Sequence, residues 1–145
     1  MVRFESGQPF SRYFWQILWT LLWVAVTGFG FYLRADPVGH GTHQQLGLAP
    51  CASMYFLHRP CPGCGLTTSW TALLHLNLGL AFRAHWLGPA LYALFTASAF
   101  VTGWASAKKL RVATNTAAFN WAVIILFVLL LVYGGLRFAR VLPYG

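Results

Sequence analysis

The chain has 145 residues, of which 58% are hydrophobic and only 8% are charged. Soluble domains carry about 25% charged residues, so this composition excludes an ordinary water-soluble protein. It indicates a small integral membrane protein with a single domain, 1–145. The net charge of +8 comes from ten Lys and Arg residues, which lie singly or in small groups beside apolar stretches. This placement favours anchoring to the head groups of a lipid bilayer and argues against nucleic-acid binding.

The first predicted element is a transmembrane helix over residues 14–33. The stretch is uncharged and has the length of about 20 residues that a helix needs to cross a bilayer. Arg34, Asp36 and Pro37 follow it and end the helix. The stretch is too long for the apolar part of a cleaved signal peptide, so we expect a retained anchor.

Three tryptophans in this helix, Trp15, Trp19 and Trp23, are four residues apart and form one stripe. Such a stripe suits packing against a pigment, quinone or haem of a neighbouring protein. Ordinary packing or lipid contact also explains the stripe, and we favour that interpretation.

Residues 34–85 form the predicted non-spanning part. Residues 34–50 are rich in Gly, Pro, His and Gln, which is typical of an irregular loop. Residues 66–76 predict a short amphipathic helix, and a further short piece, 79–84, follows it. The apolar face of the first contains four residues: Leu66, Trp70, Leu73 and Leu74. Because residues 66–76 are too few to span a bilayer, we expect an interfacial or re-entrant helix. His75 and His85 are expected at the membrane interface.

Two more transmembrane helices are predicted over residues 86–104 and 119–136. The first has small residues at the spacing that permits close helix packing: Ala93, Ala97, Ala99 and Gly103. After the second, Gly134 and Gly135 are expected to loosen the helix end, and Arg137 and Arg140 to anchor it at the interface.

Three spans place the N-terminus and the 105–118 loop on one side of the membrane. The basic residues divide evenly between the two sides, but Lys108, Lys109 and Arg111 lie in a short loop. Short loops have the most weight in the positive-inside rule, so we expect a cytoplasmic N-terminus. Residues 34–85 would then lie outside.

All three cysteines of the chain, Cys51, Cys61 and Cys64, fall within 14 residues. Cys61 and Cys64 form a C-x-x-C pair in which Pro62, Gly63 and the following Gly65 allow a sharp turn. This clustering is the best sign of a site in the sequence.

Three interpretations of the cysteines stay open. The first is a zinc site with His58, or His75, as the fourth ligand, although the chain has one cysteine knuckle where a zinc ribbon has two. The second is thiol-redox exchange. The third is structural, with a disulfide from Cys51 to Cys61 or Cys64 that leaves one cysteine over.

The stretch Cys61 to Thr67, C-P-G-C-G-L-T, resembles the signature of a family of small bacterial membrane proteins that is catalogued only as a domain of unknown function. The resemblance covers Cys51 to Tyr92 and implies a bacterial inner-membrane protein with two to four helices, without an established activity. The family usually has Arg where this chain has Thr68, and Gly-Asp where it has Leu76-Asn77. Any function that depends on an ion pair between that Arg and Asp is therefore in doubt here.

The sequence therefore predicts an all-α membrane protein with three transmembrane helices and one short interfacial or re-entrant helix after the cysteine loop. It contains no paired carboxylates, phosphate loop or Ser-His-Asp set, so we favour a non-enzymatic role. The leading hypothesis is an accessory or scaffold subunit that packs against other subunits of a larger membrane complex. The alternative is a thiol-redox or metal-binding membrane protein that acts through the cysteine loop.

Overall fold

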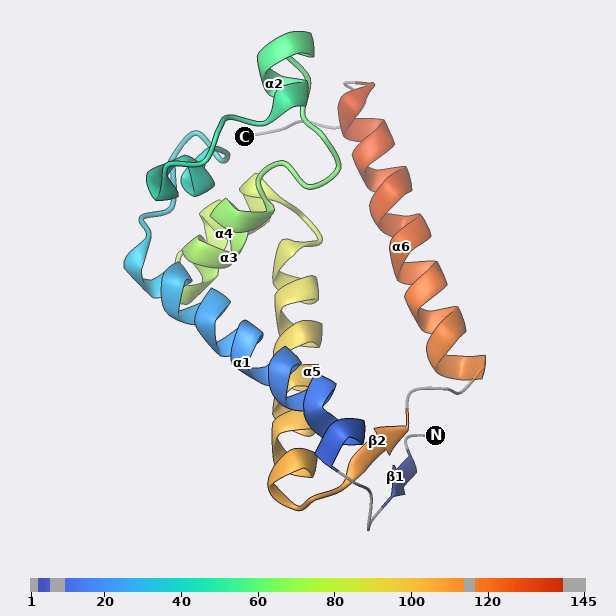
Figure 1. The fold of residues 1–145 in the computed structure, drawn as a ribbon. Helices are drawn as coiled ribbons and strands as arrows, with labels where there is room; N and C mark the ends of the chain where they lie inside the picture. Colours follow the sequence, from blue (N-terminus) through green and yellow to red (C-terminus); the bar gives the residue numbers. More distant parts are fainter. Residues whose placement is uncertain (1–2, 6–9, 114–116, 140–145) are drawn as a thin grey trace. The chain divides into compact units, whose positions relative to one another are not determined.

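The computed structural model describes residues 3–5, 10–113 and 117–139. The chain is mostly helical, as predicted (Figure 1). Its helices are α1 (Phe10–Tyr32), the 3-10 helix η1 (Thr42–Leu46), α2 (Ala52–Leu57), α3 (Leu66–Leu74), α4 (Leu78–Ala84), α5 (Gly88–Ala107) and α6 (Ala117–Phe138). Two strands that the sequence analysis did not predict, β1 (Arg3–Glu5) and β2 (Arg111–Ala113), pair antiparallel with Phe4 opposite Val112. Three residues are too few for an alternating pattern to reveal a strand.

Three helices are long and apolar enough to cross a membrane, which confirms the predicted number of spans. They cover Tyr13–Tyr32 in α1, Gly88–Ala107 in α5 and Asn120–Phe138 in α6. The predicted spans, 14–33, 86–104 and 119–136, end within three residues of these boundaries. Many of the large apolar side chains on these helices are exposed, as lipid-facing side chains must be.

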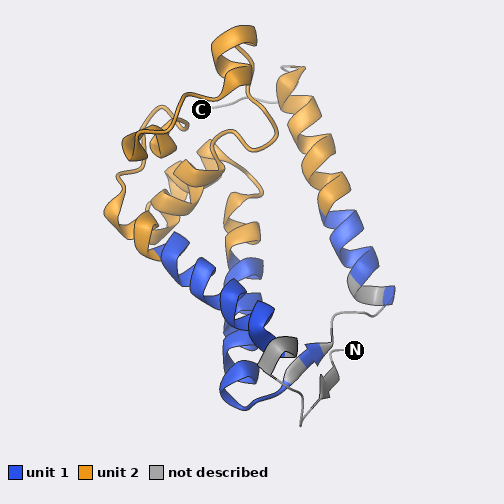
Figure 2. Ribbon diagram, viewed as in Figure 1, with its two compact units in different colours: residues 1–27, 93–126 blue, residues 28–92, 127–145 orange. Residues whose placement is uncertain are grey.

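The chain divides into two compact units (Figure 2). The first unit contains residues 1–27 and 93–126, and the second contains residues 28–92 and 127–145. Each long helix contributes residues to both units. The single-domain organisation over 1–145 stays a prediction.

In the first unit, polar bonds and aromatic rings join α1 to α5. Thr20 Oγ1 lies 3.0 Å from Thr102 Oγ1 and donates to the carbonyl of Ala99 over 3.3 Å. A Cβ added at Gly103 would lie 3.1 Å from Thr20 Cγ2, so two of the small residues noted in the sequence do permit a close contact. Ala93 and Ala97 are exposed instead.

The tryptophan stripe is used unevenly in the same unit. Trp19 and Trp23 stack at 6.1 Å between ring centroids, and both meet Phe95 edge-on. Their indole N–H groups donate over 3.2 Å to Ser98 and Thr96, respectively. Trp15 is 70% exposed. Two members of the stripe therefore pack within the chain, and a role for Trp15 with a partner or cofactor stays a prediction.

The second unit contains a small core of Ala72, Leu80 and Ala81, where α3 meets α4. The predicted amphipathic helix is present as α3, but its buried face consists of small residues, of which three are polar: Thr68, Ser69, Thr71 and Ala72. The large apolar residues of α3 are only half-buried. Lipid around the helix would remove the penalty for exposing leucine and tryptophan, so these large side chains need not turn inward.

The loop over 34–50 is more ordered than the sequence analysis predicted. It contains η1, which is flanked by two glycines with left-handed backbone conformation, Gly41 before it and Gly47 after it. Thr42 is fully buried and shares a 2.8 Å hydrogen bond with Thr68, which attaches η1 to α3. This attachment places the histidine-bearing loop beside the start of α3.

Candidate metal site

The cysteine loop runs from Cys51, before α2, to Gly65, before α3. Helix α2 ends at His58, which has a left-handed backbone with φ of 50°. The C-x-x-C turn is closed by a 3.0 Å bond from the Cys64 N–H to the Cys61 carbonyl. Gly65 then caps α3 at φ of 86°. A Cβ there would collide with the carbonyl oxygens of Ala84 and Gly39, so only glycine fits.

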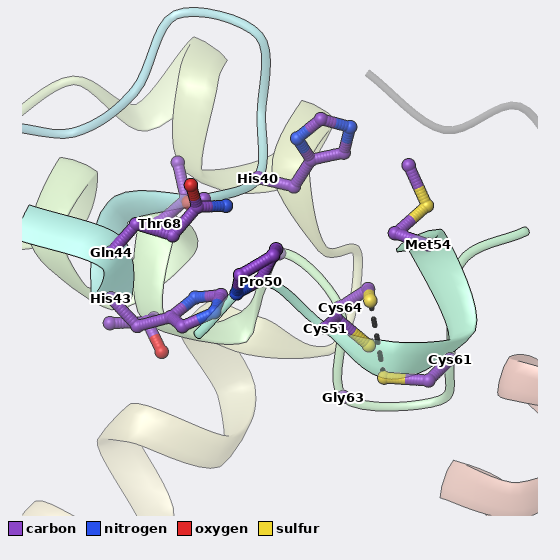
Figure 3. A pocket seen from close by; sticks show the side chains of 13 residues that line it. His40, His43, Gln44, Pro50, Cys51, Met54, Cys61, Gly63, Cys64 and Thr68 are labelled. Carbon is purple, nitrogen blue, oxygen red and sulfur yellow. Dashed lines mark hydrogen bonds between the residues drawn. The ribbon is translucent and has the colours of Figure 1, made fainter. Parts of the chain in front are cut away.

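This backbone path brings the three thiols together. The sulfur atoms of Cys51, Cys61 and Cys64 all lie within 4.8 Å of one another (Figure 3). The Cys61 and Cys64 sulfurs are 3.1 Å apart. Four sulfurs bound tetrahedrally to zinc at about 2.3 Å are about 3.8 Å from each other. The observed sulfur–sulfur distances therefore suit a shared metal ion if they change by up to about 1 Å.

The thiols open onto a cavity of about 300 Å³. His40, His43 and Gln44 from the η1 loop and Met54 from α2 also line it (Figure 3). Cys64 is buried, whereas Cys51 and Cys61 are half-buried. A cavity lined by thiols, a thioether and imidazoles offers soft ligands and no carboxylate.

The thiols differ in how readily they ionise. Burial raises the pKa of Cys51, but a hydrogen bond from the Met54 backbone N–H and the two neighbouring thiols outweigh it, so the net pKa is lowered. Burial raises the pKa of Cys64, and the neighbouring thiols raise it further. Metal ligands must be deprotonated, so binding at this cluster releases protons, above all from Cys64.

Two buried polar side chains contact the backbone carbonyls of the C-x-x-C turn. His85 is fully buried, and its Nε2 lies 3.1 Å from the Pro62 carbonyl oxygen. Arg137, from α6, is 2% exposed and donates through Nη1 to the Cys64 carbonyl over 2.9 Å. Gly134 of α6 lies so close to Pro62 that no Cβ would fit.

These contacts correct one expectation from the sequence and add to two others. His85 and Arg137, which are expected at the membrane interface, are buried within the chain, and their depth in the bilayer stays a prediction. Gly134 was expected to loosen a helix end, and it instead lies against Pro62 in a continuous helix. Arg140 lies outside the described residues. Hydropathy cannot reveal such contacts because it records no partner more than a few residues away.

The predicted fourth ligand is not brought to the sulfurs. His58 is exposed at the end of α2, and within the described part of the chain the metal-binding group contains only the three cysteines. His75 is also exposed and lies 2.9 Å from the Leu33 carbonyl oxygen. A ligand role for His58 stays a prediction, and the histidines on the cavity wall are His40 and His43.

The other motif residues lie where the turn needs them. The Pro62 carbonyl meets His85, and Gly63 and Thr67 line the cavity beside the cysteines. The Leu66 N–H donates to the Gly63 carbonyl over 3.1 Å, which joins the turn to the first residue of α3.

Comparison with known proteins finds a match to one family model but no activity. Residues 51–99 match the family described as "Protein of unknown function (DUF2752)". This match confirms the resemblance to an uncharacterised family and covers the cysteine loop, α3, α4 and the first part of α5. No curated protein and no solved structure matches the chain.

Proposed function

We propose that this protein is a membrane protein that binds one soft metal ion, zinc or monovalent copper, through the thiolates of Cys51, Cys61 and Cys64. The observation that carries the proposal is the convergence of the three sulfur atoms within 4.8 Å. Both metals bind thiolate ligands well. The lack of a carboxylate on the cavity wall argues against magnesium and calcium.

The position of the fourth ligand follows from the cavity. Three protein ligands leave one coordination position of zinc open, as in zinc sites that bind an exchangeable ligand. The cavity extends from the sulfurs to His40 and His43. The converging group in the described chain contains only the three cysteines, so we expect a small molecule in the cavity, or one of these imidazoles after residues 40–43 rearrange, to supply the remaining bond.

Metal content tests the proposal. The full chain is purified in mild detergent under anaerobic conditions, and bound metals are measured beside the Cys51→Ser, Cys61→Ser and Cys64→Ser variants. We expect one metal ion per wild-type chain and at least a tenfold weaker affinity in each variant, because each loses one of three anionic ligands. Wild-type protein that retains no more metal than the triple Ser variant would contradict the proposal.

A second candidate, thiol-redox chemistry, is favoured by the 3.1 Å separation of the Cys61 and Cys64 sulfurs. Oxidation by a quinone or a disulfide would join the two sulfurs, release two protons and transfer two electrons to that oxidant. Alkylation before and after reduction distinguishes the candidates. Thiols unmasked by reductant favour the redox role, and thiols unmasked by a chelator favour the metal site.

The location and partners belong to the same proposal. We propose a multi-pass protein of the bacterial inner membrane with a cytoplasmic N-terminus, supported by the charge of the 105–118 loop. The role of accessory subunit to a larger complex is supported only by the many exposed apolar side chains of the long helices, which lipid also covers. Migration as a lone monomer after mild extraction would count against it.

A further inference from the structure

Arg137 is a buried cation that has no acidic partner within residues 10–113 and 117–139. Its side chain is 2% exposed, one Nη donates to the Cys64 carbonyl, and Nε has no hydrogen-bond partner. The chain has only two carboxylate side chains, Glu5 and Asp36. Asp36 accepts a bond from the Val38 N–H, and no ion pair joins the residues that the structure describes. Buried charges are nearly always paired, so this one calls for an anion.

Among the residues that the structure describes, the groups around Arg137 do not supply that anion. Its guanidinium lies 5.6 Å from the ring centre of Tyr133, and this cation–π contact is with a side chain that has no carboxylate. His85 also lies against Tyr133, at 4.9 Å between ring centroids. His85 Nε2 faces a carbonyl oxygen and therefore carries the proton, so the neutral ring adds no negative charge.

The cysteine loop does supply negative charge once it holds a metal. Three thiolates carry a charge of −3, so their zinc complex carries −1 and their monovalent copper complex −2. The hydrogen bond from Arg137 ends on the backbone of one of these three ligands, Cys64. Gly134 against Pro62 holds α6 to the same turn. We infer that Arg137 is the counter-cation of the three-thiolate metal centre, an inference that rests on the proposed metal site.

If Arg137 is the counter-cation, the loss of metal affinity on removing its charge should depend on the charge of the metal–thiolate complex. The lost attraction scales with that charge, so removing the cation costs twice the free energy for copper that it costs for zinc. Arg137→Met keeps the length of the side chain and removes the charge. We expect about tenfold weaker zinc binding and about a hundredfold weaker copper binding, for an effective dielectric constant of about 20. Arg137→Lys, which keeps the charge, should restore most of both affinities.

The test is a competition titration of the full chain in detergent, with a chromophoric chelator for each metal and without oxygen for copper. Arg83→Met is the matched control, because Arg83 is an exposed arginine at the end of α4. Its affinities should equal those of the wild type. The ratio of the zinc and copper affinities does not depend on the folded fraction, so it stays informative if Arg137→Met is less stable.

Three results would overturn the inference in distinguishable ways. Unchanged affinities in Arg137→Met would contradict the role of Arg137 as counter-cation while leaving the proposed metal site intact. Equal losses for zinc and copper, with Arg137→Lys as weak as Arg137→Met, would reduce Arg137 to a hydrogen-bonding support of the loop. A wild-type chain that binds neither metal would overturn the proposed function itself.

Discussion

Gly65 is the residue at which the cysteine loop turns into α3. Its φ of 86° lies in the left-handed region, and its Cα faces the carbonyls of Ala84 and Gly39 at a distance that leaves no room for Cβ. Gly47 offers a comparison, because it has a similar φ of 75° but open space around it. The two positions separate backbone strain from steric collision.

Gly65→Ala should destabilise the protein more than Gly47→Ala does. The left-handed backbone alone costs about 1–2 kcal/mol for an alanine, and this is the loss expected at position 47. Gly65→Ala adds a collision with two backbone oxygens, which cannot rotate away, so we expect at least about 3 kcal/mol. Thermal or denaturant unfolding in detergent measures both. Equal losses of stability in the two variants would mean that the carbonyls of Ala84 and Gly39 do not press against position 65.

His85 should make the stability depend on pH. Burial lowers the pKa of its imidazole, the Pro62 carbonyl raises it less, and the charge of Arg137 lowers it further. The unfolded chain therefore binds a proton more readily than the folded one below the ordinary value of 6.5. Stability should be complete above pH 6.5 and fall by about 1.4 kcal/mol per unit as the pH drops towards the lowered pKa.

Unfolding midpoints between pH 5 and pH 8 measure this effect. His85→Gln should flatten the profile, because the variant has no proton to gain at that position. His75→Gln is the control, because it removes an imidazole from an exposed position. A wild-type profile that is already flat would argue against the buried, neutral imidazole.

At the scale of elements, α6 is both a candidate span and the support of the cysteine turn. Tyr133, Gly134 and Arg137 recur at positions three and four apart, so they share one face of the helix. All three contact the loop or the histidine that holds it: the Tyr133 ring meets His85, Gly134 meets Pro62 and Arg137 meets Cys64. Residues 127–138 therefore bear directly on the geometry of the thiols.

Gly134→Ala should weaken this contact, whereas Gly135→Ala should not. A methyl group at position 134 would press on Pro62, and overpacking of this kind costs about 1–3 kcal/mol. Gly135 has open space around it, so alanine there should be neutral or slightly stabilising through helix propensity. Unfolding and metal affinity are measured for both variants. If Gly134→Ala retained wild-type stability and affinity, α6 would not support the turn.

At the scale of the whole molecule, an odd number of spans determines which loops share a side. If all three candidate helices cross the membrane, we expect the loop between α5 and α6 on the side of the N-terminus and the cysteine loop on the other. The positive charge of Lys108 and Lys109 favours the cytoplasm for the former.

Single cysteines in a Cys51→Ser, Cys61→Ser, Cys64→Ser background test this topology. A membrane-impermeant maleimide should label His58→Cys in intact cells, and Lys108→Cys only after the membrane is permeabilised. Both positions are exposed, so the reagent should reach them once it is on the correct side. The reverse labelling pattern would mean that the protein has the opposite orientation in the membrane. Labelling of both positions from outside would contradict three spans.

The sequence by itself determined the membrane class, the three spans, α3 and the residues of the cysteine cluster. Each of these depends on local information: uncharged runs of about 20 residues, apolar periodicity, and three cysteines within 14 residues. Short elements such as β1, η1 and α2 escaped, because a few residues carry no clear periodicity.

Only the tertiary structure decided which side chains surround the cysteines. The convergence of the sulfurs, the burial of His85 and Arg137 and the contact of Gly134 with Pro62 join residues from three to 73 positions apart. Hydropathy assigns an arginine after an apolar run to the membrane surface, since a lone charge is costly inside. At Arg137 the fold provides a carbonyl acceptor, and the proposed metal–thiolate centre provides the opposite charge. That pairing is long-range, and so no local pattern in the sequence could reveal it.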